Sequence, residues 1–322
     1  MIHGDVRREA LQRWLAQPLQ GARFSLAPAS EDASFRRYFR ASLDDGRSFI
    51  AMDAPPEKED CRPFVHVASL LRDAGVHAPQ VHAQDLAQGF LLLADLGTRT
   101  YLQALDEASA PALFGDATDA LIRWQLATRP GELPPYDETL LRRELRLFPD
   151  WYFEKHLKKS PSNDENLVLS RTFDLLVKSA LAQPAVYVHR DYIPRNLMVC
   201  EPNPGVLDFQ DAVIGPITYD IVCLLRDAFV SWEEERVLDW CVRYWEKAKK
   251  AGLPVEPDFG EFWRALEWMG LQRHLKVMGI FARLHYRDGK PKYLQDTPRF
   301  LGYARPVVRR YRELAPLAAL LE

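Results

Sequence analysis

The chain has 322 residues, of which 47% are hydrophobic and 27% are charged, and its formal net charge is −3. This length allows one large domain or two lobes that each bury a core. The near balance of charge argues against a dedicated nucleic-acid-binding protein, which normally carries a basic excess.

The cysteines lack any C-x-x-C spacing, so the sequence favours free thiols in a reducing compartment over a zinc site: Cys61, Cys200, Cys223 and Cys241. The N-terminal stretch MIHGDVRREALQRWL is charged and amphipathic, and it lacks the apolar core of a signal peptide. No apolar run approaches the roughly 18 residues that cross a bilayer. We therefore expect a cytoplasmic protein with no membrane partner.

The N-terminal part is predicted to be rich in strands. Asp5 can cap a first amphipathic helix that ends before Pro18. The stretches FSLAPAS, SFRRYFRASL and RSFIAM then have the pattern of strands, with a DDG turn between the last two. A second helix is expected over residues 62–74, followed by a buried strand in GFLLLADLG, residues 89–97.

From Thr98 onward helical periodicity dominates. We expect helices over residues 111–127, 137–156, 170–181, 221–229, 233–251 and 259–284. The only strong strand signal in this half is a predicted hairpin of residues 197–200 with 205–207. The sequence thus predicts an α+β protein with a small β-rich N-lobe, residues 1–97, and a larger, mainly helical C-lobe, residues 98–322.

The segment VHRDYIPRNLMVCEPNPGVLDFQD, residues 188–211, carries the chemistry. His189, Arg190, Asp191 and Asn196 match H-R-D-x-x-x-x-N, the catalytic-loop pattern of protein kinases, and Asp208 begins D-F-Q where a kinase has D-F-G. The predicted hairpin would bring Asp208 back to Asn196. A carboxylate and an amide oxygen are ligands that magnesium prefers, and Asp191 can accept a proton from an attacking hydroxyl.

His189 is a catalytic candidate, although a buried histidine that holds the loop is the simpler interpretation. For Arg190 we expect a structural salt bridge. Arg195, next to the asparagine, is a further candidate as a cation for phosphate.

The stretches YVHRD, RNLMV and GVLDFQDAVIGPITYDIVCLLRD resemble the aminoglycoside phosphotransferase and choline kinase superfamily. More closely, together with SFRRYFR and GFLLLADLG, they resemble the anomeric N-acetylmuramate/N-acetylglucosamine kinases of bacterial cell-wall recycling. The resemblance covers nearly the whole chain. It implies a two-lobed protein-kinase-like fold, ATP and Mg2+ as cofactors, and phosphorylation of a sugar at its anomeric hydroxyl for peptidoglycan recycling.

The resemblance also implies roles for single residues. Asp191 would be the catalytic base at the substrate, and Asn196 and Asp208 would be the metal ligands. Asp220 would brace the catalytic loop, although a plain helix cap is an equal alternative. Backbone groups near Asp95 and Leu96 would bind adenine.

The chain departs from the superfamily in its N-terminal part. Ala51 or Met52 stands where a lysine usually pairs with ATP phosphates and with a helix glutamate, and the following helix has no glutamate before Asp73. Because both partners are missing together, no buried charge is left alone. Other cations would then balance the phosphates.

The stretch SEDASFRRYFR replaces the glycine-rich phosphate loop. Ser34, Phe35, Arg36 and Arg37 are the nucleotide-binding candidates in it, with Arg40 as a further cation. Strand alternation puts neighbouring side chains on opposite faces, so not all the arginines can point at the nucleotide.

Arg273, in the apolar stretch EWMGLQRHLKVMGIFARL, is a substrate candidate that could meet a lactyl carboxylate. A surface or core-edge arginine is the alternative. We expect a monomeric sugar kinase whose partners are ATP and a small sugar. The rival hypotheses are an aminoglycoside- or choline-type kinase, and a nucleotide-binding pseudokinase.

Overall fold

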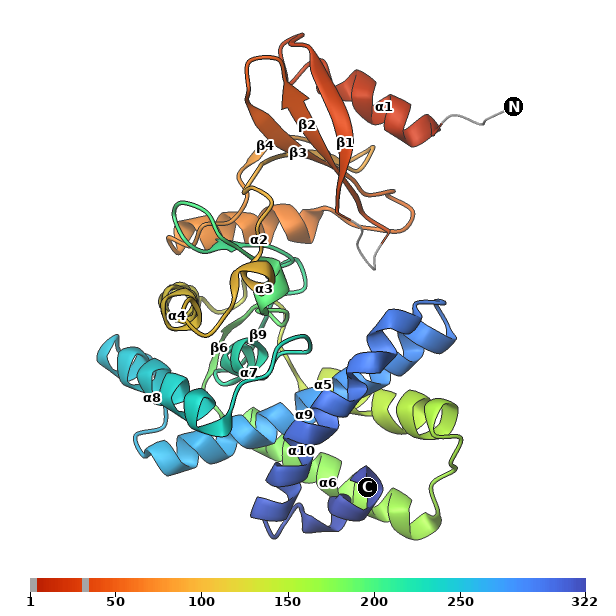
Figure 1. Cartoon of the computed structure of the whole chain (residues 1–322), viewed down its shortest axis with the longest axis vertical. Coiled ribbons are helices and arrows are strands. Elements are labelled where there is room, and N and C mark those ends of the chain that lie inside the picture. The colour runs from red at the N-terminus through yellow and green to blue at the C-terminus, as the bar shows by residue number, and fades with distance from the viewer. Residues whose placement is uncertain (1–4, 31–34) are drawn as a thin grey trace. The chain divides into compact units, whose positions relative to one another are not determined.

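The computed structural model describes residues 5–30 and 35–322, and the chain divides into two units. The first unit comprises residues 1–109 and 195–211, and the second comprises residues 110–194 and 212–322. The strand-rich N-terminal part and the helical C-terminal part that the sequence predicts are both present (Figure 1).

A five-stranded antiparallel sheet forms the first unit's framework, in the order β1-β2-β3-β5-β4. Its strands are β1 (Phe24–Ser30), β2 (Arg37–Leu43), β3 (Ser48–Asp53), β4 (Val81–Asp85) and β5 (Phe90–Ala94). Strand β4 was not predicted. This edge strand alternates between half-buried and exposed residues, so it lacks the apolar run that marks the central strand β5.

Helix α1 (Val6–Leu15) packs against this sheet (Figure 1). Asp5 caps it as predicted, since its carboxylate accepts the Arg8 amide N–H at 3.0 Å. Leu11 and Leu15 share one apolar cluster with Phe39, Ala51 and Phe90 of the sheet. The core therefore fixes the face of the sheet to which Ala51 belongs.

The first unit also contains α2 (Arg62–Asp73), α3 (Tyr101–Ala104) and a hairpin of β7 (Leu197–Met198) with β8 (Gly205–Val206). The predicted hairpin is thus present. Backbone bridges join it to the N-terminal part, from Thr100 to Met198 and from His77 to Gly205. For this reason residues 98–109 and 195–211 group with the N-terminal unit, whereas the sequence indicated a single boundary at residue 97.

The second unit is helical. Its α-helices are α4 (Ala110–Leu126), α5 (Glu138–Leu145), α6 (Asn163–Ala182), α7 (Tyr219–Leu225), α8 (Glu234–Lys250), α9 (Phe259–Tyr286) and α10 (Thr297–Arg310). Shorter helical segments are the π-helical η1 (Phe148–His156) and the 3-10 helices η2 (Pro194–Asn196, at the boundary between the units), η3 (Pro291–Asp296) and η4 (Ala315–Leu321). Strands β6 (Ala185–Val188) and β9 (Val213–Pro216) form a small antiparallel ladder, and the predicted catalytic loop follows β6 directly.

The predicted helix over residues 137–156 is interrupted. The structure has α5 and then η1, with Pro149 at the start of η1. Proline cannot donate the hydrogen bond of a continuous helix. Helix α9 also approaches closely here, because a Cβ added to Gly279 would overlap the Leu147 carbonyl.

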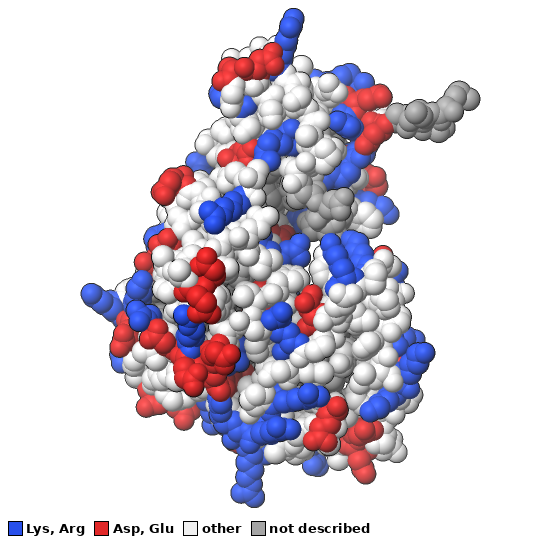
Figure 2. Space-filling view, viewed as in Figure 1, with Lys and Arg blue, Asp and Glu red and all other residues white. Residues whose placement is uncertain are grey.

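On the face of the molecule drawn in Figure 2, acidic and basic side chains are interspersed, in keeping with the formal net charge of −3. Among the residues that the structure describes, no helix combines the length and the apolarity that a membrane span requires.

Candidate active site

The β7–β8 hairpin brings Asn196 and Asp208 together within the first unit. Asn196 Nδ2 lies 3.3 Å from Asp208 Oδ2. The backbone fixes the pairing, because the Leu207 amide donates to the Asn196 carbonyl at 2.9 Å. The two predicted metal ligands therefore lie side by side, as the hairpin led us to expect.

Asp208 has φ +64°, a left-handed conformation that is uncommon outside glycine and that concentrates at functional sites. Its side chain is 36% exposed. The Asn196 amide group can rotate by half a turn, which exchanges its nitrogen and its oxygen. After that rotation the amide oxygen would lie beside the Asp208 carboxylate. A carboxylate and an amide oxygen so placed fit the needs of Mg2+, which takes few protein ligands and completes its shell with phosphate and water.

Arg36 provides positive charge beside these ligands. Its Nη2 lies 3.9 Å from Asp208 Oδ1, and its side chain is only 10% exposed. Gln210 Nε2 donates to the same Asp208 oxygen at 2.9 Å. Of the predicted strand arginines, Arg36 is therefore the one that approaches the candidate metal ligands in the first unit.

The other two strand arginines hold the sheet and its flanks together. Arg37 pairs with Asp53 at 2.5 Å and also with Asp5. Arg40 pairs with the Asp95 carboxylate at 2.6 Å. Which of the arginines would meet the nucleotide stays a prediction.

The remaining nucleotide-binding candidates are peripheral or act through their backbone. Phe35 is 62% exposed, and its amide donates to Glu59 at 3.3 Å. Ser34 lies outside the described residues. Asp95 and Leu96 directly follow β5, where a hinge would begin, with Leu96 buried and the Asp95 side chain bound to Arg40 and Ser48. Adenine binding by these backbone groups stays a prediction.

Met52 is completely buried in β3, between Tyr38 of β2 and Leu91 of β5. The buried residues of α2 are all apolar: Phe64, Val67, Ala68, Leu70 and Leu71. The position where the superfamily usually has its lysine is therefore a hydrophobic site.

The part of the predicted catalytic loop that lies in the second unit, residues 189–194, is held by buried polar groups. The Asp220 carboxylate, at the start of α7, accepts the amide N–H groups of His189 at 2.6 Å and Arg190 at 3.0 Å. His189 is 1% exposed, and its Nδ1 accepts the Asp191 amide N–H at 3.2 Å. This is the geometry of a loop held in place just before the half-buried Asp191.

Burial raises the pKa of Asp220 to about 7, although the hydrogen bonds from His189 and Arg190 oppose the rise. Asp220 is fully enclosed, so the loop depends on an acid that water does not reach. The N-cap position of α7 is Thr218, and no side chain caps it, so the alternative of a plain helix cap for Asp220 is wrong. The carboxylate instead binds the backbone of residues 189 and 190.

Arg195 is half-buried in η2 directly before Asn196. Arg273, on α9, is 4% exposed, and its Nη1 donates to the Arg226 carbonyl at 3.1 Å. Within residues 5–30 and 35–322, Arg273 makes no salt bridge. The polar residues Gln272, Arg273 and His274 of this apolar helix are therefore all buried.

Glu144 and Lys276 were not among the predicted site residues. The expected salt bridge of Arg190 is present, and its partner is Glu144 of α5 at 2.6 Å. Lys276 Nζ lies 3.0 Å from the same Glu144 oxygen. Lys276 lies one turn after Gln272 and Arg273 on the apolar helix α9. A lysine within an apolar helix was the sequence signal that could have identified it as a buried, paired residue.

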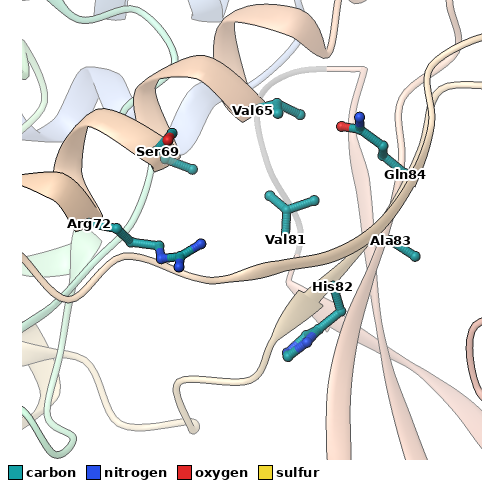
Figure 3. Close-up of a pocket in the computed structure, with 8 residues that line it drawn as sticks. Val65, Ser69, Arg72, Val81, His82, Ala83 and Gln84 are labelled. Carbon is teal, nitrogen blue, oxygen red and sulfur yellow. The ribbon is translucent and has the colours of Figure 1, made fainter.

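A groove of about 360 Å³ lies between α2 and β4 in the first unit (Figure 3). Val65 and Arg72 line it from α2, and His82 and Gln84 line it from β4. None of the predicted site residues lines this groove, so it is separate from the candidate site.

The arrangement defines a class of protein with a kinase-like phosphotransferase fold. An amicoumacin kinase solved with AMP-PNP, Ca2+ and its ligand has a similar structure, with a TM-score of 0.64 at 15% identity over 98% of this chain and 100% of that chain. At this identity the likeness concerns the fold alone.

Residues 25–257 match the model of the phosphotransferase enzyme family, and the chain belongs to this family. It is 60% identical to the N-acetylmuramate/N-acetylglucosamine kinase of Pseudomonas aeruginosa over 296 residues, 92% of this chain and 87% of the relative. It is 52% identical to the kinase of the same name from Neisseria meningitidis, over 98% of this chain and 95% of the relative. The chain is an ATP-dependent kinase, and the pseudokinase hypothesis is set aside.

Proposed function

We propose that this kinase transfers the γ-phosphoryl group of ATP to the anomeric C1 hydroxyl of N-acetylmuramate or N-acetylglucosamine. The product would be a sugar 1-phosphate for peptidoglycan recycling, made in the cytoplasm, where ATP is available. The observation that carries the proposal is the 60% identity to a kinase named for these two sugars. Asp191, Asn196 and Asp208 retain the residue types that phosphoryl transfer requires.

On the nucleotide side, Asp208 and Asn196 would hold Mg2+, and Arg36 would contribute a positive charge to the phosphates. Bound magnesium would neutralise charge that develops on the phosphate oxygens. Arg36 is suited to its role because its guanidinium already lies 3.9 Å from Asp208. Arg195 is a second cation for the phosphates. Arg37 is less suited, because Asp53 and Asp5 bind its guanidinium.

On the acceptor side, Asp191 would accept the proton of the attacking hydroxyl. His189 and Asp220 would hold the loop so that the carboxylate faces the sugar. An anomeric hydroxyl is more acidic than the other ring hydroxyls, because the ring oxygen withdraws electron density. Positioning of the reactants would therefore contribute most of the rate, with the base acting late in the reaction.

Arg273 would recognise the acidic acceptor. Burial opposes its charge, but the neighbouring acidic groups, including Cys223, Asp227 and Asp191, raise the pKa of Arg273. A buried guanidinium that makes no salt bridge among the described residues, and that senses the charge of Asp191, is suited to a lactyl carboxylate. N-Acetylglucosamine lacks this carboxylate, so Arg273→Met should lower the apparent affinity for N-acetylmuramate more than that for N-acetylglucosamine.

The test is an acceptor screen with the purified full chain, ATP and magnesium. Free N-acetylmuramate and N-acetylglucosamine should both be phosphorylated, and the product should be acid-labile and non-reducing, as a glycosyl phosphate is. The 1-O-methyl glycosides keep every other hydroxyl but lack the nucleophile, so they should be inert. Turnover of the methyl glycosides, or a product that still reduces, would contradict the anomeric assignment. Turnover only with aminoglycosides or choline would replace the acceptor class.

A further inference from the structure

The Glu144 carboxylate is the centre of a buried polar network behind the catalytic loop. Its Oε1 accepts from Arg190 Nη2 at 2.6 Å and from Lys276 Nζ at 3.0 Å. Its Oε2 accepts the Tyr136 hydroxyl proton and lies 3.4 Å from Gln272 Nε2. One side chain of α5 thus contacts the residue before Asp191, helix α9 and the segment before α5, all within the second unit.

The charges in this network depend on one another. Burial opposes ionisation of Glu144, but the positive charges of Lys276 and Arg190 lower its pKa. Lys276 also donates to the Tyr219 hydroxyl at 2.9 Å. A single carboxylate therefore faces two cations, the buried Lys276 and the half-buried Arg190. Its loss would leave both cations in a region of low dielectric without their shared counter-ion.

Arg190 is the residue directly before Asp191, and it has φ +76°. Residues with a Cβ rarely adopt this left-handed conformation, and they keep it only where the surroundings enforce it. Three contacts do so here. Asp220 accepts the Arg190 amide N–H, the Cys223 thiol donates to the Arg190 carbonyl at 3.4 Å, and Glu144 binds the guanidinium.

We propose that Glu144 is a positioning residue for phosphoryl transfer. Its ion pair with Arg190 holds the backbone in the left-handed conformation that presents Asp191 to the acceptor. The inference rests on the proposed function only in taking Asp191 as the catalytic base. It assigns no contact between Glu144 and either substrate.

The test compares Glu144→Gln with a matched control, Glu267→Gln. Glu267 is also a buried carboxylate, 4% exposed, bound by an arginine, Arg310, and by a tyrosine hydroxyl, that of Tyr311 at 2.6 Å. Both variants should lower the thermal unfolding midpoint. Only Glu144→Gln should lower kcat, by about tenfold or more, while the Kd for ATP with magnesium stays within about twofold of the original.

The second arm is a rescue by Arg190→Gly. Glycine adopts a positive φ without steric cost and carries no guanidinium that needs a counter-ion. The double variant Glu144→Gln/Arg190→Gly should therefore recover kcat to within about threefold of the original protein, even though its thermal midpoint stays low. If Glu144→Gln alone does not fold, kcat of the double variant decides in the same way.

Two results would overturn the proposal. One is an equal fall in kcat for Glu144→Gln and Glu267→Gln, which would mean that kcat follows stability alone. The other is a double variant that folds but has a kcat as low as that of Glu144→Gln. If Glu144→Gln does not fold, the corresponding result is a double variant whose kcat is at least tenfold below that of the original protein. A protein that phosphorylates a different acceptor would contradict the proposed function, yet it would still allow this comparison with that acceptor.

Discussion

Replacement of Met52 by lysine tests whether the absence of the superfamily's lysine is compensated or is simply a loss. Met52 is completely buried between its neighbouring strands, and the buried face of α2 offers no carboxylate. A lysine at this site would bury an ammonium group without a partner. An uncompensated buried charge costs about 3–5 kcal/mol of the free energy of unfolding. Met52→Leu preserves volume and should cost less than about 1.5 kcal/mol.

The destabilisation by Met52→Lys should depend on pH. Burial lowers the pKa of a lysine below its unfolded value of about 10.4, so the unfolded chain would bind more protons than the folded protein. The free energy of unfolding of the variant, relative to Met52→Leu, should therefore increase as pH rises toward about 10. Turnover with ATP and the sugar should not exceed that of the original protein.

The assay is urea unfolding of both variants at pH 7 and at pH 10, alongside steady-state turnover. A Met52→Lys protein with raised turnover and an unchanged urea midpoint would refute the reasoning, because it would show that the site can accept a useful cation. Equal destabilisation at both pH values would show that a buried charge is not the cause.

The other predictions concern residues of the candidate site. Asp191→Asn should lower turnover by about two to four decades with the Kd for ATP little changed, as titration calorimetry can check; near-normal turnover would remove Asp191 from the mechanism. Arg36→Ala should raise the apparent KM for ATP severalfold, whereas Arg37→Ala should mainly lower the thermal midpoint, since Arg37 binds Asp53; the opposite pattern would exchange their roles. With a pKa raised to about 7, Asp220 makes the folded protein bind more protons than the unfolded chain, so its contribution to the free energy of unfolding falls as pH rises from about 4 to 7. Asp220→Asn should lose that part of the slope in urea unfolding measured across this range, and an unchanged slope would contradict the assignment.

Local sequence signals were sufficient for much of the site. The apolar runs 197–200 and 205–207 on either side of a turn predicted a hairpin that returns Asp208 to Asn196. Hairpin pairing joins residues that are close in sequence, so local signals were enough. The strands β1, β2, β3 and β5 were predicted because their apolar and turn residues follow local rules. The missing lysine was evident from the sequence, since neither Ala51 nor Met52 of the predicted strand is a lysine.

Only the tertiary structure decided which charges meet. Arg36 and Arg37 are adjacent in sequence, yet Arg36 approaches Asp208 and Arg37 binds Asp53. Arg36 lies just before β2 and Arg37 is its first residue, so strand alternation alone does not assign their partners. Glu144, Arg190 and Lys276 lie on separate segments, and no local pattern pairs them. Their contact depends on the packing of α5 and α9 around the catalytic loop, and burial in that packing makes each of these charges require its partners.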